Sequence, residues 1–225
     1  MNETARRWFE SRTFRAGDRD VEGLRRAKGN TRVSVVIPAR NEAQTVGEIV
    51  ASIRDAHLQG TGLVDELFVI DSDSIDDTAR VAQAAGAEVH SASGIRPEFG
   101  WRPGKGEAMW KSLFVATGDI VVFIDADLTT FTPDYVTGLL MPLLLHDDIS
   151  LVKAFYDRDL AGSARGTSQG GRVTELTARP IINMWWPDLA CVVQPLAGEW
   201  AARRSLLETL KFPSGYGIEL AALLD

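Results

Sequence analysis

Three short apolar runs, each followed within three residues by polar side chains, constrain the fold of this 225-residue chain more than any other feature. The runs span residues 33–37, 67–70 and 120–124 and are rich in valine and isoleucine, which favours β-strands. Between the first two, residues 46–53 repeat aliphatic side chains with the spacing of one helix face. Strands that alternate with helices predict right-handed β-α-β units. We therefore expect an α/β fold with a mostly parallel sheet.

The rest of the sequence predicts further elements of both kinds. The additional strands are expected at residues 87–90, 150–155 and 192–200. The additional helices are expected to begin at residues 76–78, with Asp76 or a neighbour as the cap, and to cover residues 105–117, 133–144 and 218–225. A Gly-rich stretch at residues 166–171 predicts a loop. These elements continue the α/β pattern into the second half of the chain.

The first 31 residues differ in character from the rest. They are polar and Arg-rich, and three aromatic residues, Trp8, Phe9 and Phe14, are interspersed among the arginines. We interpret residues 1–31 as an N-terminal arm that docks through its aromatic side chains, and its arginines as a solvated face.

Composition and charge exclude several classes of protein. The chain carries 24 Lys+Arg against 31 Asp+Glu, for a net charge of −7, whereas nucleic-acid binders usually have a basic surface. The single cysteine, Cys191, cannot form an intrachain disulfide. There is no 18-residue apolar stretch and no signal-peptide core. We expect a soluble, cytoplasmic protein without nucleic-acid partners or membrane spans.

Polar clusters at the ends of the three strong strands indicate a binding site. They cover residues 38–42, 71–74 and 125–127. Ligands of open α/β sheets bind at the carboxyl ends of the strands, so the clusters are expected to share one cleft. In the last cluster, Asp125 and Asp127 are separated by one residue and could bind Mg²⁺ or Mn²⁺, which prefer oxygen ligands. The alternative for this pair is a turn that closes the strand.

The motifs at these strand ends resemble those of known glycosyltransferases. Val-Val-Ile-Pro-Ala-Arg-Asn-Glu at residues 35–42, Ile-Asp-Ser-Asp-Ser at 70–74, Pro-Gly-Lys-Gly at 103–106 and Asp-Ala-Asp at 125–127 are similar to family-2-like glycosyltransferases with the GT-A fold. Three later motifs are more specific and resemble the glucosyl-3-phosphoglycerate synthase family: Gly-Gly-Arg-Val-Thr-Glu-Leu at 170–176, Gln-Pro-Leu-Ala-Gly-Glu at 194–199 and Gly-Tyr-Gly-Ile-Glu at 215–219.

That family consists of retaining glycosyltransferases, classified as family 81, and includes mannosyl-3-phosphoglycerate synthases. The resemblance implies a GT-A domain over residues 32–225, built on a Rossmann-like, mostly parallel sheet flanked by helices. Its nucleotide-sugar half would cover residues 32–130 and its acceptor half residues 131–225. The resemblance also implies a homodimer.

The implied reaction moves a hexose from a nucleotide diphosphate sugar to 3-phosphoglycerate, with retention at the anomeric carbon. UDP-glucose is the favoured donor, and GDP-mannose and GDP-glucose stay possible, because one sequence does not fix the few contacts that select the base and the sugar. The implied cofactor is Mg²⁺ or Mn²⁺.

The resemblance also assigns roles to individual residues. Asp127 would bind the metal and, with Lys105 and Glu219, form the catalytic set. The donor would be bound by Pro38, Ala39, Asn41, Glu42, Asp71, Ser72, Lys105, Asp125, Ala126, Tyr216 and Glu219. The phosphate and carboxylate of the acceptor would be bound by Gly171, Arg172, Val173 and Thr174. Arginine suits this task because its guanidinium forms paired bonds to either group.

The histidines depart from the family pattern. The metal site of the family is completed by a histidine downstream of the Gly-Tyr-Gly segment, but His57, His90 and His146 all lie upstream of it. We interpret His57 as helix surface, His90 as a strand end and His146 as a helix C-terminus. We expect that the chain lacks the C-terminal part of the family, together with that ligand.

Two other functions stay open on the sequence alone. Residues 125–129, Asp-Ala-Asp-Leu-Thr, also fit the nucleophile loop of haloacid-dehalogenase-like phosphatases, in which Asp125 would form an aspartyl phosphate. That loop normally follows the first strand, whereas several units precede it here. The other alternative is a nucleotide-binding module without catalysis.

Overall fold

Six strands in the part of the chain that the structure describes form one sheet in the order β3-β2-β1-β4-β6-β5. The structure is a computed structural model that describes residues 2–15, 20–156 and 171–225. The strands are β1 Val33–Ala39, β2 Glu66–Asp71, β3 Glu88–Ser91, β4 Ile120–Phe123, β5 Leu151–Lys153 and β6 Trp200–Arg203. The pairings among β3, β2, β1 and β4 are parallel, whereas β6 is antiparallel to both β4 and β5. The expected α/β fold with a mostly parallel sheet is confirmed.

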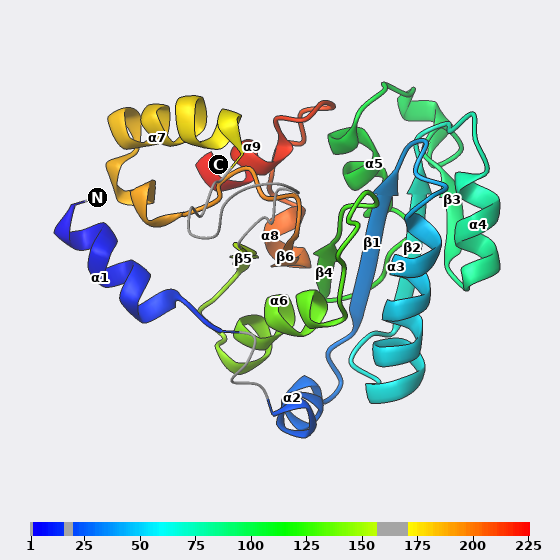
Figure 1. Ribbon diagram of the computed structural model, residues 1–225, viewed down its shortest axis with the longest axis horizontal. Helices are drawn as coiled ribbons and strands as arrows, with labels where there is room; N and C mark the ends of the chain where they lie inside the picture. The colour runs from blue at the N-terminus through cyan, green and yellow to red at the C-terminus, as the bar shows by residue number, and fades with distance from the viewer. Residues whose placement is uncertain (1, 16–19, 157–170) are drawn as a thin grey trace.

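Helices cover both faces of this sheet (Figure 1). The α-helices are α1 Glu3–Arg12, α2 Val21–Lys28, α3 Val46–Ile53, α4 Thr78–Ala85, α5 Lys105–Ser112, α6 Asp134–Leu145, α7 Arg179–Trp185, α8 Arg204–Leu207 and α9 Ile218–Leu224. Two π-helical segments, Arg54–Thr61 and Thr174–Ala178, continue α3 and precede α7, and short 3₁₀ turns lie at Pro97–Phe99 and Pro187–Cys191.

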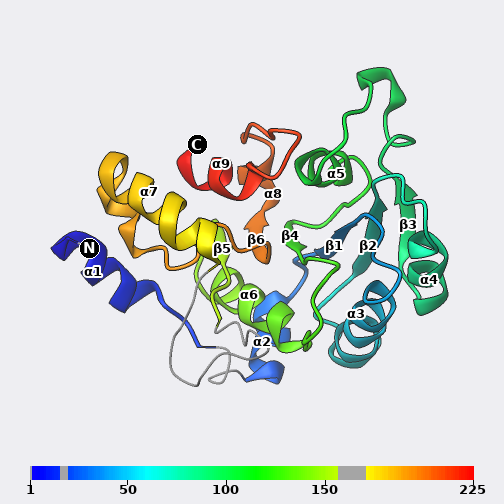
Figure 2. The same ribbon diagram turned by 45° about the horizontal axis from the view of Figure 1, so that its top comes forward.

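Alternation along the strands separates two hydrophobic cores. In β1, Val33, Val35 and Ile37 face one core, and Val36 faces the other. The first core packs α2, α3, α4 and α6 against the sheet, and the second packs α5, α8 and α9 against it. Figure 2 shows these two groups of helices on opposite sides of the strands. The sheet is therefore the buried middle layer, and its carboxyl edge is free for a site.

Several predicted boundaries are wrong, and the structure gives the reasons. The helix expected over residues 105–117 ends at Ser112. The next three N–H groups bond to carbonyls three residues earlier, as in a 3₁₀ turn, and the Arg204 side chain donates to the carbonyls of Leu113, Ala116 and Gly118 in the segment that follows the helix. The strand expected over residues 192–200 begins only at Trp200, after a 3₁₀ turn and an irregular segment. The predicted loop at residues 166–171 lies outside the described residues except for its last member.

The N-terminal arm contains two helices, α1 and α2, which the sequence did not suggest. Two of its aromatic side chains dock as expected: the Phe9 ring lies 6.2 Å from Phe155, and the Phe14 ring lies 5.2 Å from His146. Trp8 stays half exposed. Within the described part of the chain, every helix is too short or too polar to span a bilayer.

The prediction that His57 lies on a helix surface is wrong. Its side chain is buried, with Nε2 at 2.9 Å from the Pro133 carbonyl oxygen and Nδ1 at 3.2 Å from the Thr61 hydroxyl. His57 therefore joins the π-helical segment to the start of α6. His90 lies on β3, and His146 caps the C-terminus of α6, as expected.

Candidate active site

The three polar clusters meet at one edge of the sheet. Strands β2, β1 and β4 are parallel neighbours, so their carboxyl ends lie side by side. The backbone N–H of Asn41 donates to Ser74 Oγ (2.9 Å), which joins the first two clusters. The hydroxyl of Thr45, which lies three residues beyond the first cluster, donates to the Ala126 carbonyl of the third cluster (2.6 Å). The predicted cleft residues of these clusters are thus in contact through their own loops.

The loop after β1 contains one residue with a positive φ angle, and asparagine stands at that position. Pro38 and Ala39 are the last residues of the strand. Asn41 adopts a positive φ of 60°, which asparagine tolerates better than most residues, and its Oδ1 accepts from the Ile75 N–H (2.9 Å). Glu42 follows, and its N–H donates to Thr78 Oγ1 (2.8 Å). The segment that leads from β2 into α4, residues 74–78, therefore holds this loop in place.

Asp71 and Ser72 form the buried floor beside that loop. Both side chains are buried, and Asp71 Oδ2 accepts from the Ser74 N–H (3.2 Å). Asp71 Oδ1 is buried without a hydrogen-bond partner among the described residues. A buried acceptor without a partner is costly, so a ligand N–H donor would be favoured at this position.

Lys105 is the centre of an ion cluster at the end of β4. Its Nζ lies 2.5 Å from Asp125 Oδ1 and 2.6 Å from Glu219 Oε1. Burial alone would lower the pKa of Lys105, but the Asp125 and Glu219 carboxylates outweigh it and raise the pKa above the ordinary lysine value. The structure therefore brings together three residues that are spread over 114 positions of the sequence, from Lys105 at the start of α5 to Glu219 on α9. This cluster is a fixed, charged group of donors and acceptors facing the cleft.

Close backbone packing explains the glycines on either side of Lys105. A Cβ atom on Gly104 would lie 2.2 Å from the Ser214 carbonyl oxygen, and one on Gly106 would lie 1.9 Å from that of Pro213. The N–H groups of Gly106 and Glu107 donate to the carbonyls of Gly215 and Ser214. The segment before α9 thus caps α5, so it positions Lys105 and Glu219 together.

Close packing against Asp125 also leaves no room for a side chain at Gly198. A Cβ atom at position 198 would lie 1.9 Å from Asp125 Oδ2. The carboxylate is therefore confined between the Lys105 ammonium group and the Gly198 backbone. This contact gives a physical reason for the glycine in the Gln-Pro-Leu-Ala-Gly-Glu motif.

Asp127 has different surroundings from Asp125. It is exposed, and no hydrogen bond or ion pair to its carboxylate is found among the described residues. The pKa of the neighbouring Glu42 is raised, first by burial and then by the charges of Asp127, Asp76 and Asp125. This rim of the cleft is acidic and would be neutralised by a cation.

The donor set fits a hard divalent cation, although the chain supplies few ligands for it. Carboxylate oxygen suits Mg²⁺ and Mn²⁺, which often keep waters and substrate phosphates as further ligands. Within residues 2–15, 20–156 and 171–225, no group of three or more His, Cys, Asp or Glu side chains could hold a metal. Because Asp125 is paired with Lys105, Asp127 is the carboxylate that is open to a cation.

The predicted acceptor residues lie at the start of the π-helical segment before α7. Gly171 and Arg172 are exposed, Val173 is 63% exposed and Thr174 is buried. Tyr216, predicted near the donor sugar, is 83% exposed. Among the described residues, no hydrogen bond or ion pair joins these side chains to the Lys105 cluster.

Three residues beside the cluster were missed by the sequence analysis. Glu199 is fully buried, and one of its carboxylate oxygens accepts from the Tyr156 hydroxyl (3.0 Å). Burial, and then the charge of Asp125, raises the pKa of Glu199. Lys153 lies at the end of β5 and donates to the Ala197 carbonyl (2.9 Å). The available signal was that Glu199 ends the Gln-Pro-Leu-Ala-Gly-Glu motif at residues 194–199. Nothing in the sequence distinguished Lys153 or Tyr156.

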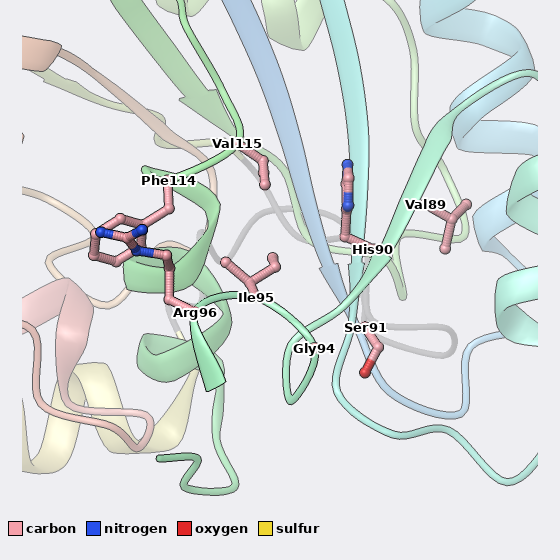
Figure 3. Close-up of a pocket in the computed structure, with 8 residues that line it drawn as sticks. All are labelled: Val89, His90, Ser91, Gly94, Ile95, Arg96, Phe114 and Val115. Atoms are coloured by element: carbon pink, nitrogen blue, oxygen red, sulfur yellow. The ribbon is translucent and has the colours of Figure 1, made fainter. Parts of the chain in front are cut away.

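Two cavities lie outside the cluster. One of about 430 Å³ is lined at the β3 edge by residues that include His90, Ser91, Arg96 and Phe114 (Figure 3). None of the predicted site residues lines it. The other, of about 1150 Å³, lies between α1, α6 and β5 and reaches Lys153. The carboxyl edge of the sheet therefore remains the candidate site.

Comparison with known proteins identifies the family. The model of the glycosyl transferase family 2 matches residues 34–200. The glucosyl-3-phosphoglycerate synthase of Mycolicibacterium paratuberculosis is 47% identical over 97% of this chain and 67% of its own length. That of Mycolicibacterium smegmatis is 48% identical over 97% of this chain and 72% of its own length. For the Petrotoga mobilis enzyme the identity is 44% over 88% of this chain and 61% of its own length. The chain thus spans about two thirds of the length of these relatives.

Solved structures agree with this match. The glucosyl-3-phosphoglycerate synthase of Mycobacterium tuberculosis in complex with Mn²⁺, UDP-glucose and phosphoglyceric acid superposes with a TM-score of 0.83 at 47% identity, over 92% of this chain and 69% of that one. The complex of the same enzyme with Mn²⁺, UDP and glucosyl-3-phosphoglycerate gives a TM-score of 0.85 at 46% identity, over 95% and 71%. The fold and the motifs therefore have one common explanation: this chain belongs to the glucosyl-3-phosphoglycerate synthase family of GT-A glycosyltransferases.

Proposed function

We propose that this protein transfers glucose from UDP-glucose to 3-phosphoglycerate, with retention at the anomeric carbon. One observation carries the proposal: the ion cluster of Lys105, Asp125 and Glu219 lies at the carboxyl end of β4, next to the open carboxylate of Asp127. The relative from Mycobacterium tuberculosis, 47% identical, has been crystallised with Mn²⁺, UDP-glucose and phosphoglyceric acid, which supports the same substrates here.

The nucleotide would lie over the ends of β1 and β2. Asp71 Oδ1, buried without a partner among the described residues, would accept from an N–H of the base. The loop of Pro38, Ala39, Asn41 and Glu42 would hold the base and the ribose. Both uracil and guanine present a ring N–H, so this contact supports a nucleotide without selecting UDP over GDP. Mannosyl transfer from GDP-mannose therefore stays a second specificity to test.

Asp127 would hold the divalent cation. When bound, Mg²⁺ or Mn²⁺ would neutralise the negative charge of the diphosphate leaving group. Glu42 and Asp76 would add to the attraction of a cation. The charges of Asp127 and Asp76 both raise the pKa of Glu42, so the three carboxylates are close enough to act on one cation.

The homodimer implied by the resemblance stays a prediction, which light scattering would test.

The ion cluster would position the sugar and the diphosphate. Lys105 stays charged because Asp125 and Glu219 raise its pKa, so its ammonium group can attract the diphosphate while the two carboxylates accept from sugar or ribose hydroxyls. Catalysis would then come from orientation and from charge stabilisation.

The cluster also bears on the stereochemistry. Asp125 and Glu219 are both paired with Lys105, so neither carboxylate is a free nucleophile. A same-face displacement fits this arrangement: the acceptor oxygen bonds to the anomeric carbon, the bond from that carbon to the diphosphate oxygen breaks, and the hydroxyl proton passes to the departing diphosphate. The acceptor would be held by its phosphate and carboxylate through Gly171, Arg172, Val173 and Thr174.

The confinement of Asp125 between Lys105 and Gly198 also argues against the phosphatase alternative, because that reaction needs Asp125 as its nucleophile.

The proposal is tested by assaying transfer from UDP-glucose, GDP-glucose and GDP-mannose to 3-phosphoglycerate with Mn²⁺ or Mg²⁺, with the anomeric configuration of the product read by NMR. We expect transfer from UDP-glucose, retention of the α configuration, and loss of transfer in Asp127→Ala. Transfer from a GDP sugar alone would change the donor assignment. Release of inorganic phosphate from small phosphoesters, without transfer, would contradict the proposal.

A further inference from the structure

Lys153 is a cation beside the ion cluster that the proposed function does not use. It is the last residue of β5 and pairs with Trp200 of β6. Its Nζ lies 5.8 Å from the centre of the Trp200 ring and donates one hydrogen bond to the Ala197 carbonyl oxygen (2.9 Å). No ion pair of Lys153 is found in the described part of the chain. An ammonium group has three N–H donors, so two are left for another partner.

Charged groups from four elements surround this ammonium group. They are Glu219 on α9, Lys105 on α5, Glu199 before β6 and Asp125 after β4. Three of the four belong to the ion cluster, so Lys153 lies next to the place where the donor sugar is expected. None of the carboxylates is close enough to form an ion pair with it. An acceptor that attacks the sugar must approach this same place.

Lys153 also lines the cavity of about 1150 Å³ on the side of β5. Gln194 lines the same cavity; its Nε2 donates to the Tyr156 carbonyl (2.7 Å), while its Oε1 is buried without a partner among the described residues. This wall of the cavity therefore includes a cation, which suits a ligand with anionic oxygens, and a buried amide oxygen lies nearby in the same wall.

We infer that Lys153 is a further acceptor-binding residue, whose ammonium group donates to an anionic oxygen of 3-phosphoglycerate beside the ion cluster. The inference rests on the proposed function, because it takes the acceptor from there. It adds a cation from β5 to the predicted acceptor residues 171–174, which lie on a different segment.

The inference makes acceptor binding dependent on pH. Burial lowers the pKa of Lys153 to about 8; the charge of Lys105 acts in the same direction, and those of Glu219, Glu199 and Asp125 oppose it. The ammonium form is therefore lost as the pH rises through about 8. The phosphate and carboxylate of the acceptor are fully ionised in that range, so a weaker affinity at higher pH would come from the protein.

The test measures the affinity of 3-phosphoglycerate for the protein loaded with Mn²⁺ and UDP, by calorimetry at pH 7 and pH 9. For the unchanged protein we expect the affinity to fall several-fold between the two values. For Lys153→Met we expect about a tenfold weaker affinity at pH 7, the usual size for a lost charged hydrogen bond, and no further fall. Lys153→Arg, which keeps its charge, should retain affinity at both values.

Two controls make the outcomes distinct. UDP affinity, measured separately, should be the same in all variants, which verifies that each has folded. Lys211→Met removes an exposed lysine and should behave as the unchanged protein does. If Lys153→Met binds 3-phosphoglycerate as tightly and with the same pH dependence as the unchanged protein, the inference is wrong and the proposed function stands. If the unchanged protein binds UDP but not 3-phosphoglycerate, the proposed acceptor is wrong, and the inference with it.

Discussion

At the scale of single residues, the site depends on one ammonium group that keeps two carboxylates together. Removing one partner from a buried ion pair leaves an uncompensated charge, and Lys105 serves two partners at once. Because its pKa in the folded protein is raised, its contribution to stability is fully present below the ordinary lysine pKa. That contribution is lost only when the pH rises beyond the ordinary lysine range. The cluster is therefore stable throughout the neutral range.

Gly198→Ala should disable the site through Asp125. The new methyl group would lie 1.9 Å from Asp125 Oδ2, so the carboxylate must move away from Lys105. We expect kcat/KM for transfer to fall at least tenfold, with a smaller effect on the melting temperature than on activity. The matched control is Gly94→Ala, because its nearest neighbour would be an ordinary 3.4 Å contact in a loop away from the cluster. Equal activity of the two variants would show that Asp125 need not be confined.

Glu199→Gln should stabilise the protein at neutral pH. The pKa of Glu199 is raised by burial and by Asp125, so the folded state holds its proton at pH values where the unfolded state has lost it. Stability therefore falls as the pH rises above the ordinary glutamate pKa. Glutamine removes this loss and can still accept from the Tyr156 hydroxyl. We expect a higher melting temperature than that of the unchanged protein at pH 7.5, with the difference shrinking towards pH 4. A lower melting temperature at pH 7.5 would contradict the raised pKa.

The sequence predicted some of these residues and could not predict others. Asp125, Lys105 and Glu219 were named through motif resemblance, and the structure places them in direct contact. Lys153 and Glu199 escaped notice because their importance depends on the antiparallel pairing of β5 with β6, which periodicity does not reveal. The different roles of Asp125 and Asp127 were predicted only through the resemblance. The structure gives the two carboxylates different neighbours, since Asp125 pairs with Lys105 and Asp127 is exposed.

At the scale of elements, the first turn of α5 depends on a segment more than 100 residues later in the chain. The carbonyls of Ser214 and Gly215 accept hydrogen bonds from the N–H groups of Glu107 and Gly106. The N-cap residue of α5, Gly104, makes no side-chain hydrogen bond to the helix, so these carbonyls take the place of an ordinary cap. The same segment leads directly into α9, which carries Glu219. The sequence predicted both helices, but it could not show that one caps the other, because such a contact depends on the tertiary fold.

Gly106→Ala should therefore act on two elements at once. Its methyl group would lie 1.9 Å from the Pro213 carbonyl oxygen, so either the start of α5 or the segment before α9 must shift. We expect a lower melting temperature and a weaker affinity for UDP-glucose, measured by thermal unfolding and calorimetry. The Gly94→Ala control separates this effect from that of an added methyl group in general. An unchanged donor affinity would show that the two elements need not be held together.

At the scale of the whole molecule, the parallel and antiparallel parts of the sheet have different tasks. The parallel strands β2, β1 and β4 end in the three loops that are predicted to bind the nucleotide. The antiparallel strands β6 and β5 bring Gly198, Glu199 and Lys153 close to Asp125. The alternation of strand and helix patterns in the sequence predicted the α/β class. It could not predict that β6 runs antiparallel to its neighbours, because the direction of a strand depends on how the chain connects it to the sheet. The site therefore exists only when both parts of the sheet are formed.

Donor binding should accordingly stabilise the entire fold, and the metal should matter only when a diphosphate is present. A ligand at 100 times its Kd adds about 2.7 kcal/mol to the free energy of unfolding, which for a chain of this size raises Tm by about 5–10 °C. We expect this shift for UDP-glucose with Mn²⁺ and a smaller one after chelation. Uridine, which lacks the diphosphate, should give a shift that Mn²⁺ does not change. In Asp127→Asn, Mn²⁺ should no longer increase the shift with UDP-glucose, since the open carboxylate is gone. A variant that still responds to Mn²⁺ as the unchanged protein does would place the cation elsewhere.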